Sequence, residues 1–172
     1  DKFFETNRSQ IVDFCHARKF GDARITVVVE ETPLETAGGI VNALPLLGER
    51  PFAVVNGDVY TDFPFARLQA IDLQKDLAHL VMVPNPAHHP KGDFVLEQGR
   101  LMPLGQSRVT YAGLSVMRPE LFDGVRPGKA ALRPLLDTAI SQARLSAQLW
   151  SGLWSDVGTP ARLRELENKL DQ

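Results

Sequence analysis

The hydrophobic and polar positions of the chain predict short strands that alternate with helices. Three β-branched runs lack strict alternation: residues 25–29 (ITVVV), 52–56 (FAVVN) and 78–83 (AHLVMV). Such runs are typical of strands that are covered on both faces, as in a parallel sheet. Helical patterns lie between them, at residues 36–44 with Thr36 as the N-cap and at residues 62–74 with Asp62 as the N-cap. This order of elements predicts right-handed crossovers and an α/β fold with helices on both faces of a Rossmann-like sheet.

The pattern changes after Pro84. Further elements are predicted as a hairpin around Gln98-Gly99, a strand over residues 110–117, a helix over 131–143, and a final strand and turn over 149–159. Thr159 and Pro160 then predict the N-cap and first turn of a closing helix, whose inward-facing residues are Leu163, Leu166 and Leu170. The sheet is therefore expected to be mixed but mainly parallel.

Composition and charge narrow the class of protein. The chain has 172 residues, enough for one domain with a real core, and a net charge of −2 without a basic block. That balance argues against a nucleic-acid or membrane-surface partner. One cysteine, Cys15, excludes an internal disulfide framework and fits a reducing cytoplasm. Since no apolar run or signal peptide marks a membrane or secreted protein, we expect a cytoplasmic monomer or homodimer.

A carboxylate directly follows one predicted buried strand. Asn56, Gly57 and Asp58 come after residues 52–55, and ligands of open α/β sheets collect beyond the carboxyl ends of strands. Gly57 would let the backbone approach a ligand, and Asp58 would point into the crevice. A simple turn explains the same three residues equally well.

Two glycines lie in the first turn of the helix predicted at residue 36. Gly38 and Gly39 each cost roughly 1 kcal/mol in helix propensity. A flat ring lying against bare backbone would offset that cost. Close packing of the helix on a strand is the alternative, and on this segment alone it is the better explanation.

Asp156, in the segment WSDVGT, follows a predicted strand as Asp58 does. Alone it would be an ordinary loop residue. Two carboxylates that converge from separate strand ends could hold Mg²⁺, which takes few protein oxygens and completes its shell with water and phosphate. By contrast, His88 and His89 are adjacent and are better explained by a proline-rich solvent loop, and Asp93 is either a turn residue or an acceptor for a polyol.

Three segments in this order resemble the sugar-phosphate nucleotidyltransferase family. They are EETPLETAGGIVNALPLL (30–47), VVNGDV (54–59) and WSDVGTPARL (154–163). Within that family, VNGDVYTDFPFARLQ, HHPKGDF and YAGLSVMRPELF are most similar to bacterial N-acetylmuramate-1-phosphate uridylyltransferases of cell-wall (peptidoglycan) recycling. Mannose-1-phosphate guanylyltransferases are hard to separate from these by eye.

The resemblance implies transfer of a nucleotidyl group from a nucleoside triphosphate, expected to be UTP, to a sugar 1-phosphate, with release of pyrophosphate. It implies Mg²⁺ at Asp58 and Asp156, and that these two residues serve catalysis. It also implies a nucleotide site and a sugar site. The nucleotide-site residues are Leu34, Thr36, Gly38, Gly39, Asn56 and Gly57; those of the sugar site are Asn56, Gly92, Asp93, Thr110 and Gly113.

The chain departs from the family pattern in two places. Nothing matches the glycine-rich phosphate loop of the family's first strand, so residues 1–172 are interpreted as a single domain without its first strand–loop–helix unit, about fifty residues. We therefore expect little turnover by this chain alone, and an unpaired sheet edge. The segment GQSRVTYAG (105–113) stands where many members have Glu-Lys-Pro. A sugar-nucleotide-binding module without catalysis is the alternative of another class.

Overall fold

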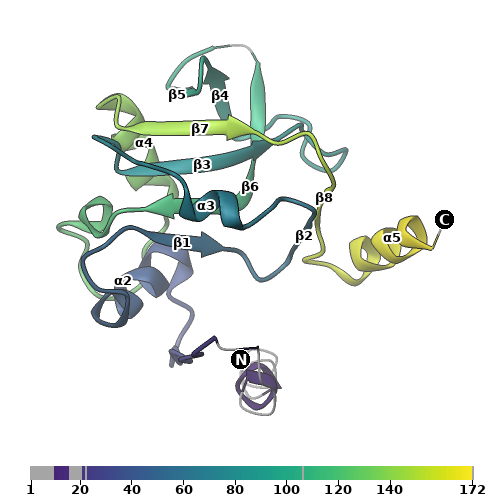
Figure 1. Ribbon diagram of the computed structural model, residues 1–172, viewed down its shortest axis with the longest axis horizontal. Coiled ribbons are helices and arrows are strands. Elements are labelled where there is room, and N and C mark those ends of the chain that lie inside the picture. Colours follow the sequence, from purple (N-terminus) through teal and green to yellow (C-terminus); the bar gives the residue numbers. More distant parts are fainter. Residues whose placement is uncertain (1–9, 16–20, 22, 106, 172) are drawn as a thin grey trace.

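The computed structural model describes residues 10–15, 21, 23–105 and 107–171 (Figure 1). The named elements are, in chain order, α2 (Glu35–Leu47), β1 (Phe52–Val55), β2 (Val59–Thr61), α3 (Ala66–Gln69), β3 (Ala78–Val83), β4 (Phe94–Glu97), β5 (Arg100–Met102), β6 (Arg108–Met117), the 3₁₀ helix η1 (Pro119–Phe122), α4 (Arg133–Ser141), β7 (Leu145–Leu149), β8 (Trp154–Asp156) and α5 (Pro160–Leu170).

Six of these strands form one mixed sheet in the order β1-β6-β3-β7-β5-β4, and β2 and β8 pair separately. The mixed sheet is confirmed, but "mainly parallel" is wrong: within the described residues β3–β7 is the parallel pairing and the others are antiparallel. The reason is β6, which inserts antiparallel between β1 and β3. A further β6–β4 pairing also closes the sheet on itself, unlike an open Rossmann-like sheet.

The strands β1, β3 and β7 nevertheless point the same way. Both β1 and β3 are antiparallel to β6, and β7 is parallel to β3. Their carboxyl ends therefore lie at one edge of the sheet, beside β2 and β8 (Figure 1). This edge carries the predicted site residues.

Helices cover both faces of the sheet, as predicted. Alternation along β3 sends Leu80 and Met82 into a cluster with α2, η1 and α4. It sends Val81 and Val83 into a second cluster with Leu68 of α3. Each of the four β3 residues is at most 2% exposed. Because β3 is buried on both faces, its sequence is apolar without the alternation of a half-exposed strand.

Most predicted elements are confirmed. These are the strands beginning at residues 52, 78 and 110, the hairpin at Gln98-Gly99, the helix α4 and the N-cap Thr159, whose Oγ1 accepts a hydrogen bond from the Arg162 amide at 3.3 Å. Gln98 and Gly99 both have positive φ, as a tight two-residue hairpin turn requires. The strand β7 was missed: residues 144–148 were given no element, and Leu149 was assigned to the final strand.

The predicted strand at residues 25–29 is wrong, since the segment has no regular secondary structure. Its side chains Ile25 and Val29 are 44% and 48% exposed. A strand needs a neighbour to satisfy its backbone groups, and within the described residues this segment pairs with none.

Both predicted N-caps before residue 70 are also wrong. The helix α2 begins at Glu35 with Leu34 at the cap, and no side chain caps it. The carboxylate of Asp62 instead accepts a hydrogen bond from the Trp150 indole at 3.0 Å, and α3 begins only at Ala66. The prediction failed because a local capping pattern competes with tertiary partners for the same side chain.

The closing helix α5 projects from the body of the protein (Figure 1). Leu166 is 4% exposed, but Leu163 and Leu170 are 44% and 51% exposed. The prediction that all three face inward is therefore right only for Leu166. Among the described elements the helix packs against the short strand β8, and Leu163 and Leu170 lie on its exposed side.

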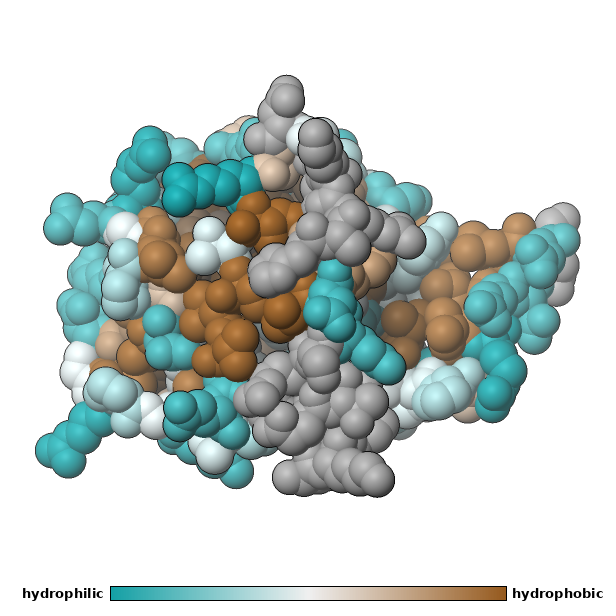
Figure 2. All heavy atoms as spheres, turned by 90° about the horizontal axis from the view of Figure 1, so that it is seen from below, coloured by the Kyte–Doolittle hydropathy of each residue, from teal (hydrophilic) through white to brown (hydrophobic). Residues whose placement is uncertain are grey.

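The outer edge of β1 is open in the described part of the chain, because β1 is the end strand of its sheet. A groove of about 370 Å³ runs along this edge between β1 and α2. Its neighbours Val55 and Leu47 are 46% and 41% exposed. Viewed from this side, apolar residues fill the centre of the surface (Figure 2). The expectation of an unpaired, apolar sheet edge is thus met by β1.

No helix among the described residues is both long and apolar enough to span a bilayer.

The imidazole of His79 makes the stability of the fold dependent on pH. Burial lowers its pKa from 6.5, and the nearby Asp76 carboxylate opposes this only in part. A lowered pKa in the folded state means that the unfolded chain binds more protons near pH 6.5, so stability is lost as the pH falls below that value. The native ring is neutral and shares a 2.9 Å hydrogen bond with the Ser146 hydroxyl.

We therefore expect the free energy of unfolding to fall between pH 7.5 and 5.5, and to fall less in His79→Asn, which keeps a polar group near Ser146. Urea unfolding of both proteins at the two pH values measures this. Equal losses in the two proteins would assign the pH dependence to other groups.

Candidate active site

The candidate site lies at the carboxyl ends of β1, β3 and β7. Asn56 and Asp58 follow β1, the segment from His88 to Asp93 follows β3, and Asp156 lies beyond β7 in β8. One cavity of about 340 Å³, which we call the carboxylate cavity, is lined by Asn56, Asp58, His88, His89, Asp93 and Asp156 together with neighbouring residues. The structure thus brings Asn56, Asp58, Asp93 and Asp156 together at this edge of the sheet, and their chemical role stays a prediction.

Pairing of β2 with β8 brings Asp58 and Asp156 together. Val59 lies opposite Asp156, and the Val157 amide donates a 2.8 Å hydrogen bond to the Asp58 carbonyl. A Cβ placed on Gly158 would lie 2.9 Å from Asp58 Oδ2 and 3.1 Å from Asp156 Oδ1. Arg162 Nη2 lies 3.2 Å from the same position. The two carboxylates therefore flank a single point that the glycine leaves without a side chain, and the Arg162 guanidinium borders it.

The two carboxylates have different surroundings. Asp156 Oδ2 accepts a 2.7 Å hydrogen bond from Arg162 Nη1 and lies 3.4 Å from His88 Nε2, while Asp156 Oδ1 accepts the Gly158 amide at 3.0 Å. The Asp58 carboxylate makes no hydrogen bond or ion pair with any other described residue. Asp58 is exposed, so no described side chain competes with a ligand for its carboxylate oxygens.

The residues present fit a magnesium ion better than a metal bound by protein alone. No group of three or more His, Cys, Asp or Glu side chains among the described residues could hold a metal. Mg²⁺ commonly binds through one or two carboxylates, with water and phosphate as its other ligands. Asp58 and Asp156 provide that donor set, and magnesium remains a prediction.

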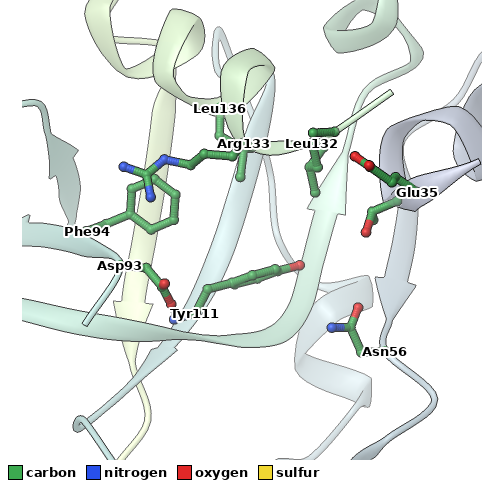
Figure 3. Close-up of a pocket in the computed structure, with 10 residues that line it drawn as sticks. Glu35, Asn56, Asp93, Phe94, Tyr111, Leu132, Arg133 and Leu136 are labelled. Carbon is green, nitrogen blue, oxygen red and sulfur yellow. Dashed lines mark hydrogen bonds between the residues drawn. The ribbon is translucent and has the colours of Figure 1, made fainter. Parts of the chain in front are cut away.

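A second cavity of about 460 Å³ adjoins the first and is here called the Arg133 cavity (Figure 3). The two cavities share Asn56, Asp93 and Tyr111 in their lining. The other residues that line the Arg133 cavity are Glu35, Thr36, Phe94, Ala131, Leu132, Arg133 and Leu136. Together the cavities have the size of a site for a small molecule.

The shared wall is rigidly held. The backbone amide of Asn56 donates a 2.8 Å hydrogen bond to the Gly113 carbonyl, and Gly113 has a φ of 75°. A Cβ on Gly113 would lie 2.9–3.0 Å from the Asn56 side chain, so only glycine lets Asn56 take this position. Burial raises the pKa of Tyr111 to about 12, despite a hydrogen bond with Ser115, so its hydroxyl is protonated at neutral pH.

The Asp93 carboxylate is fixed from two sides. Its Oδ2 accepts the Tyr111 amide at 2.8 Å, and its Oδ1 lies 3.0 Å from His89 Nε2. Thr110 Oγ1 donates to Asn85 Oδ1 at 2.9 Å. The predicted sugar-site residues Asn56, Asp93, Thr110 and Gly113 all line the carboxylate cavity, and their role toward a sugar stays a prediction.

Gly92 has a structural role. Its φ is 61°, and a Cβ there would press against Asn85 and Arg108. It lines neither cavity. Gly57 also lines neither, lies in the turn between β1 and β2, and has open space beside it, so the turn and ligand-approach interpretations are both consistent with the structure.

The predicted nucleotide-site residues of α2 lie apart from Asp58. Thr36 lines both the Arg133 cavity and the β1 groove, and Gly39 lines the groove. Leu34 and Gly38 line neither of the two site cavities; a Cβ on Gly38 would collide with the Gly128 carbonyl. Close packing therefore explains Gly38, although the helix packs here on the loop at Gly128 and Ala130 and not on a strand as expected. Nucleobase contact by the other residues is still a prediction.

Several site residues were missed from the sequence. His88 and His89 were assigned to a solvent loop, yet both line the carboxylate cavity and contact Asp156 and Asp93. Their position just after the buried strand β3 was the signal that could have found them. Arg133 and Arg162 belong to helices, and nothing in their local pattern distinguished them from surface charges.

The sequence is similar to those of known nucleotidyltransferases. No protein-family model matches the chain. It is 48% identical over 141 residues to the N-acetylmuramate alpha-1-phosphate uridylyltransferase of Neisseria meningitidis serogroup B, covering 78% of this chain and 61% of that protein. It is 28% identical over 156 residues to the mannose-1-phosphate guanylyltransferase catalytic subunit beta of Dictyostelium discoideum, covering 84% and 43%.

Solved structures show the same fold. HddC from Yersinia pseudotuberculosis, complexed with GMP-PN, superposes with a TM-score of 0.73 at 15% identity, over 95% of this chain and 74% of that one. A putative glucose-1-phosphate thymidylyltransferase from Bacillus anthracis gives 0.71 at 15% identity, over 84% and 64%.

The fold is thus the α/β fold of nucleotidyltransferases, with a candidate site at the edge where β1, β3 and β7 end. Over most of its length the chain is similar to the sugar-phosphate nucleotidyltransferase family. It spans about three-fifths of the length of the Neisseria relative and less than half that of the Dictyostelium one.

Proposed function

We propose that this protein transfers a uridylyl group from UTP to N-acetylmuramate 1-phosphate, giving the UDP-sugar and pyrophosphate, with Mg²⁺ as cofactor. The observation that carries the proposal is the convergence of Asp58 and Asp156 beside Gly158, in the lining of the carboxylate cavity, which adjoins the Arg133 cavity. The 48% identity to the Neisseria uridylyltransferase supports the choice of substrates. A cytoplasmic location and a role in peptidoglycan recycling belong to the same proposal.

The residues of the chain would act by positioning the reactants. The sugar phosphate oxygen attacks the α-phosphorus of the nucleotide in line and pyrophosphate leaves, so no covalent enzyme intermediate is needed and orientation carries much of the rate. Asn56 and Asp93 offer an amide and a carboxylate to the sugar hydroxyls from the shared wall. Arg162 holds Asp156 in its orientation, at 2.7 Å.

Mg²⁺, when bound, neutralises charge on the phosphate oxygens. Asp58 and Asp156 would hold it, because their carboxylates flank one open point. His88 Nε2, at 3.4 Å from Asp156 Oδ2, lines the same cavity and would offer a ring N–H to a phosphate oxygen there. The ion and this donor would act on the negative charge that collects during the transfer.

Mannose-1-phosphate guanylyltransferase activity is the second candidate. It is supported by the 28% identity to the Dictyostelium relative. The two candidates differ in both base and sugar, so product binding separates them.

Calorimetric titration of the 172-residue chain tests the proposal. We expect UDP-N-acetylmuramate to bind in the presence of Mg²⁺ and to bind at least about 10-fold more weakly with EDTA, since one charge-assisted contact alone has that weight. GDP-mannose is the matched ligand and is expected to bind more weakly. Preference for GDP-mannose would favour the second candidate, and metal-independent binding would overturn the magnesium site.

A further inference from the structure

The Arg133 cavity has an unusual lining for a site that holds only a neutral sugar. Its walls are largely apolar and aromatic, with Phe94, Tyr111, Leu132 and Leu136 among them, and Arg133 is its one lysine or arginine among the described lining residues. Figure 3 shows the Arg133 guanidinium beside the Phe94 ring, on the side of the cavity away from Asn56. The guanidinium carbon lies 4.3 Å from the ring centroid.

The two acidic residues of the cavity already have partners. Glu35 forms an ion pair with Lys129 at 3.2 Å. Asp93 accepts the Tyr111 amide at 2.8 Å and contacts His89 at 3.0 Å. Neither carboxylate contacts Arg133, whose ion-pair partner is Asp137, one turn further along α4 and outside the cavity lining.

Arg133 has donors to spare. Its Nε donates to both oxygens of Asp137, at 2.8 and 3.0 Å, on the solvent side of α4. Its two Nη groups donate to no other described residue. A guanidinium that is oriented by an aromatic ring and an aspartate, with its fork of N–H groups free, suits a carboxylate in a two-point contact.

We propose that Arg133 selects a sugar that bears a carboxylate, and so makes an acidic amino sugar the preferred substrate. This inference rests on the proposed function. The sugar named for the Neisseria relative, N-acetylmuramate, carries a lactyl carboxylate at its 3-position, whereas mannose and N-acetylglucosamine have none. The shared wall of Asn56, Asp93 and Tyr111 connects the two cavities, so a sugar with its phosphate near Asp58 extends a substituent toward Arg133.

Two ligands that differ only in that substituent provide the test. UDP-N-acetylmuramate and UDP-N-acetylglucosamine are titrated, with Mg²⁺, into the unchanged chain and into Arg133→Ala, Arg133→Lys and Arg126→Ala. Arg126 is the matched control, because it is exposed on the segment before α4 and lines neither cavity.

We expect the unchanged chain to prefer the carboxylate-bearing ligand by about 10- to 100-fold, the range of a charge-assisted hydrogen-bond pair. Arg133→Ala should abolish this preference while leaving the affinity for UDP-N-acetylglucosamine within about twofold. Arg133→Lys should retain part of the preference for the carboxylate-bearing ligand, and Arg126→Ala should retain all of it. Circular dichroism and thermal melting confirm that each variant is folded.

Failure of this inference is distinct from failure of the proposed function. If both UDP-sugars bind with Mg²⁺ but the unchanged chain shows no preference, or if Arg133→Ala keeps the preference, Arg133 does not select the carboxylate and the transferase proposal stands. If neither UDP-sugar binds to the folded chain, the proposed function itself fails.

Discussion

Replacing Asp58 or Asp156 by asparagine is expected to lower Mg²⁺-dependent binding of UDP-N-acetylmuramate at least about 100-fold, or roughly 3 kcal/mol. Both carboxylates flank the open point beside Gly158, and an amide oxygen is a much weaker ligand for a hard cation. Because both act through the same ion, the double variant should lose little more than either single one. Calorimetry with Mg²⁺ and with EDTA measures the difference.

The two substitutions should differ in their effect on the fold. Asp58 has no partner among the described residues, so Asp58→Asn should leave the melting temperature without metal unchanged or slightly raised. Asp156→Asn removes the carboxylate partner of Arg162, whose Nε is already buried without a partner among the described residues. This substitution should lower the melting temperature without metal. Asp62→Asn is the matched control, because Asp62 follows β2 directly and lines neither cavity. Equal binding by Asp58→Asn and the unchanged chain would remove Asp58 from the metal site.

The second large effect is expected at Gly38. A Cβ there would collide with the Gly128 carbonyl and lie 3.0 Å from Leu34 Cβ. The amides of Ala37 and Gly38 both donate to the Ala130 carbonyl at 3.1 Å, so α2 cannot move away without losing these bonds. Gly38→Ala should therefore destabilise the protein by roughly 2–4 kcal/mol, despite the helix propensity of alanine.

Gly39→Ala is the matched control. Its new Cβ would meet only the Glu30 carboxylate, the end of a flexible side chain. We expect its stability to be equal or higher by up to about 1 kcal/mol. Thermal melting separates the two variants by about 5–15 °C for a chain of this size. Equal melting temperatures would mean that α2 shifts easily on its neighbours, and would reopen the ring-binding interpretation of Gly38.

The positions of some site residues could be predicted from the sequence, because chain order and strand direction together determine them. Asp58 and Asp156 each follow a strand, so their meeting at one edge was predictable from the rule for α/β sheets. What was not predictable was how they meet: β2 and β8 are three-residue strands with ordinary composition. Their pairing depends on contacts between segments almost a hundred residues apart, which no local pattern contains.

Predictions based on one local signal were the ones that failed. Thr36 and Asp62 have the right residue types for N-caps, but the helices begin elsewhere because tertiary contacts determine their first turns. Residues 25–29 have strong β propensity but pair with no strand in the described part of the chain. Propensity describes what a segment tolerates, and a strand also requires a neighbour.

The open edge of β1 has a thermodynamic consequence. Any added strand that pairs with this edge in the folded sheet, and not with the unfolded chain, raises the free energy of unfolding by mass action. At a concentration of 100 times its dissociation constant, the gain is about 2.7 kcal/mol. Thermal stability then becomes a readout of strand addition, so fragments of related chains can be ranked as complements of this one by melting temperature alone, without any assay of catalysis.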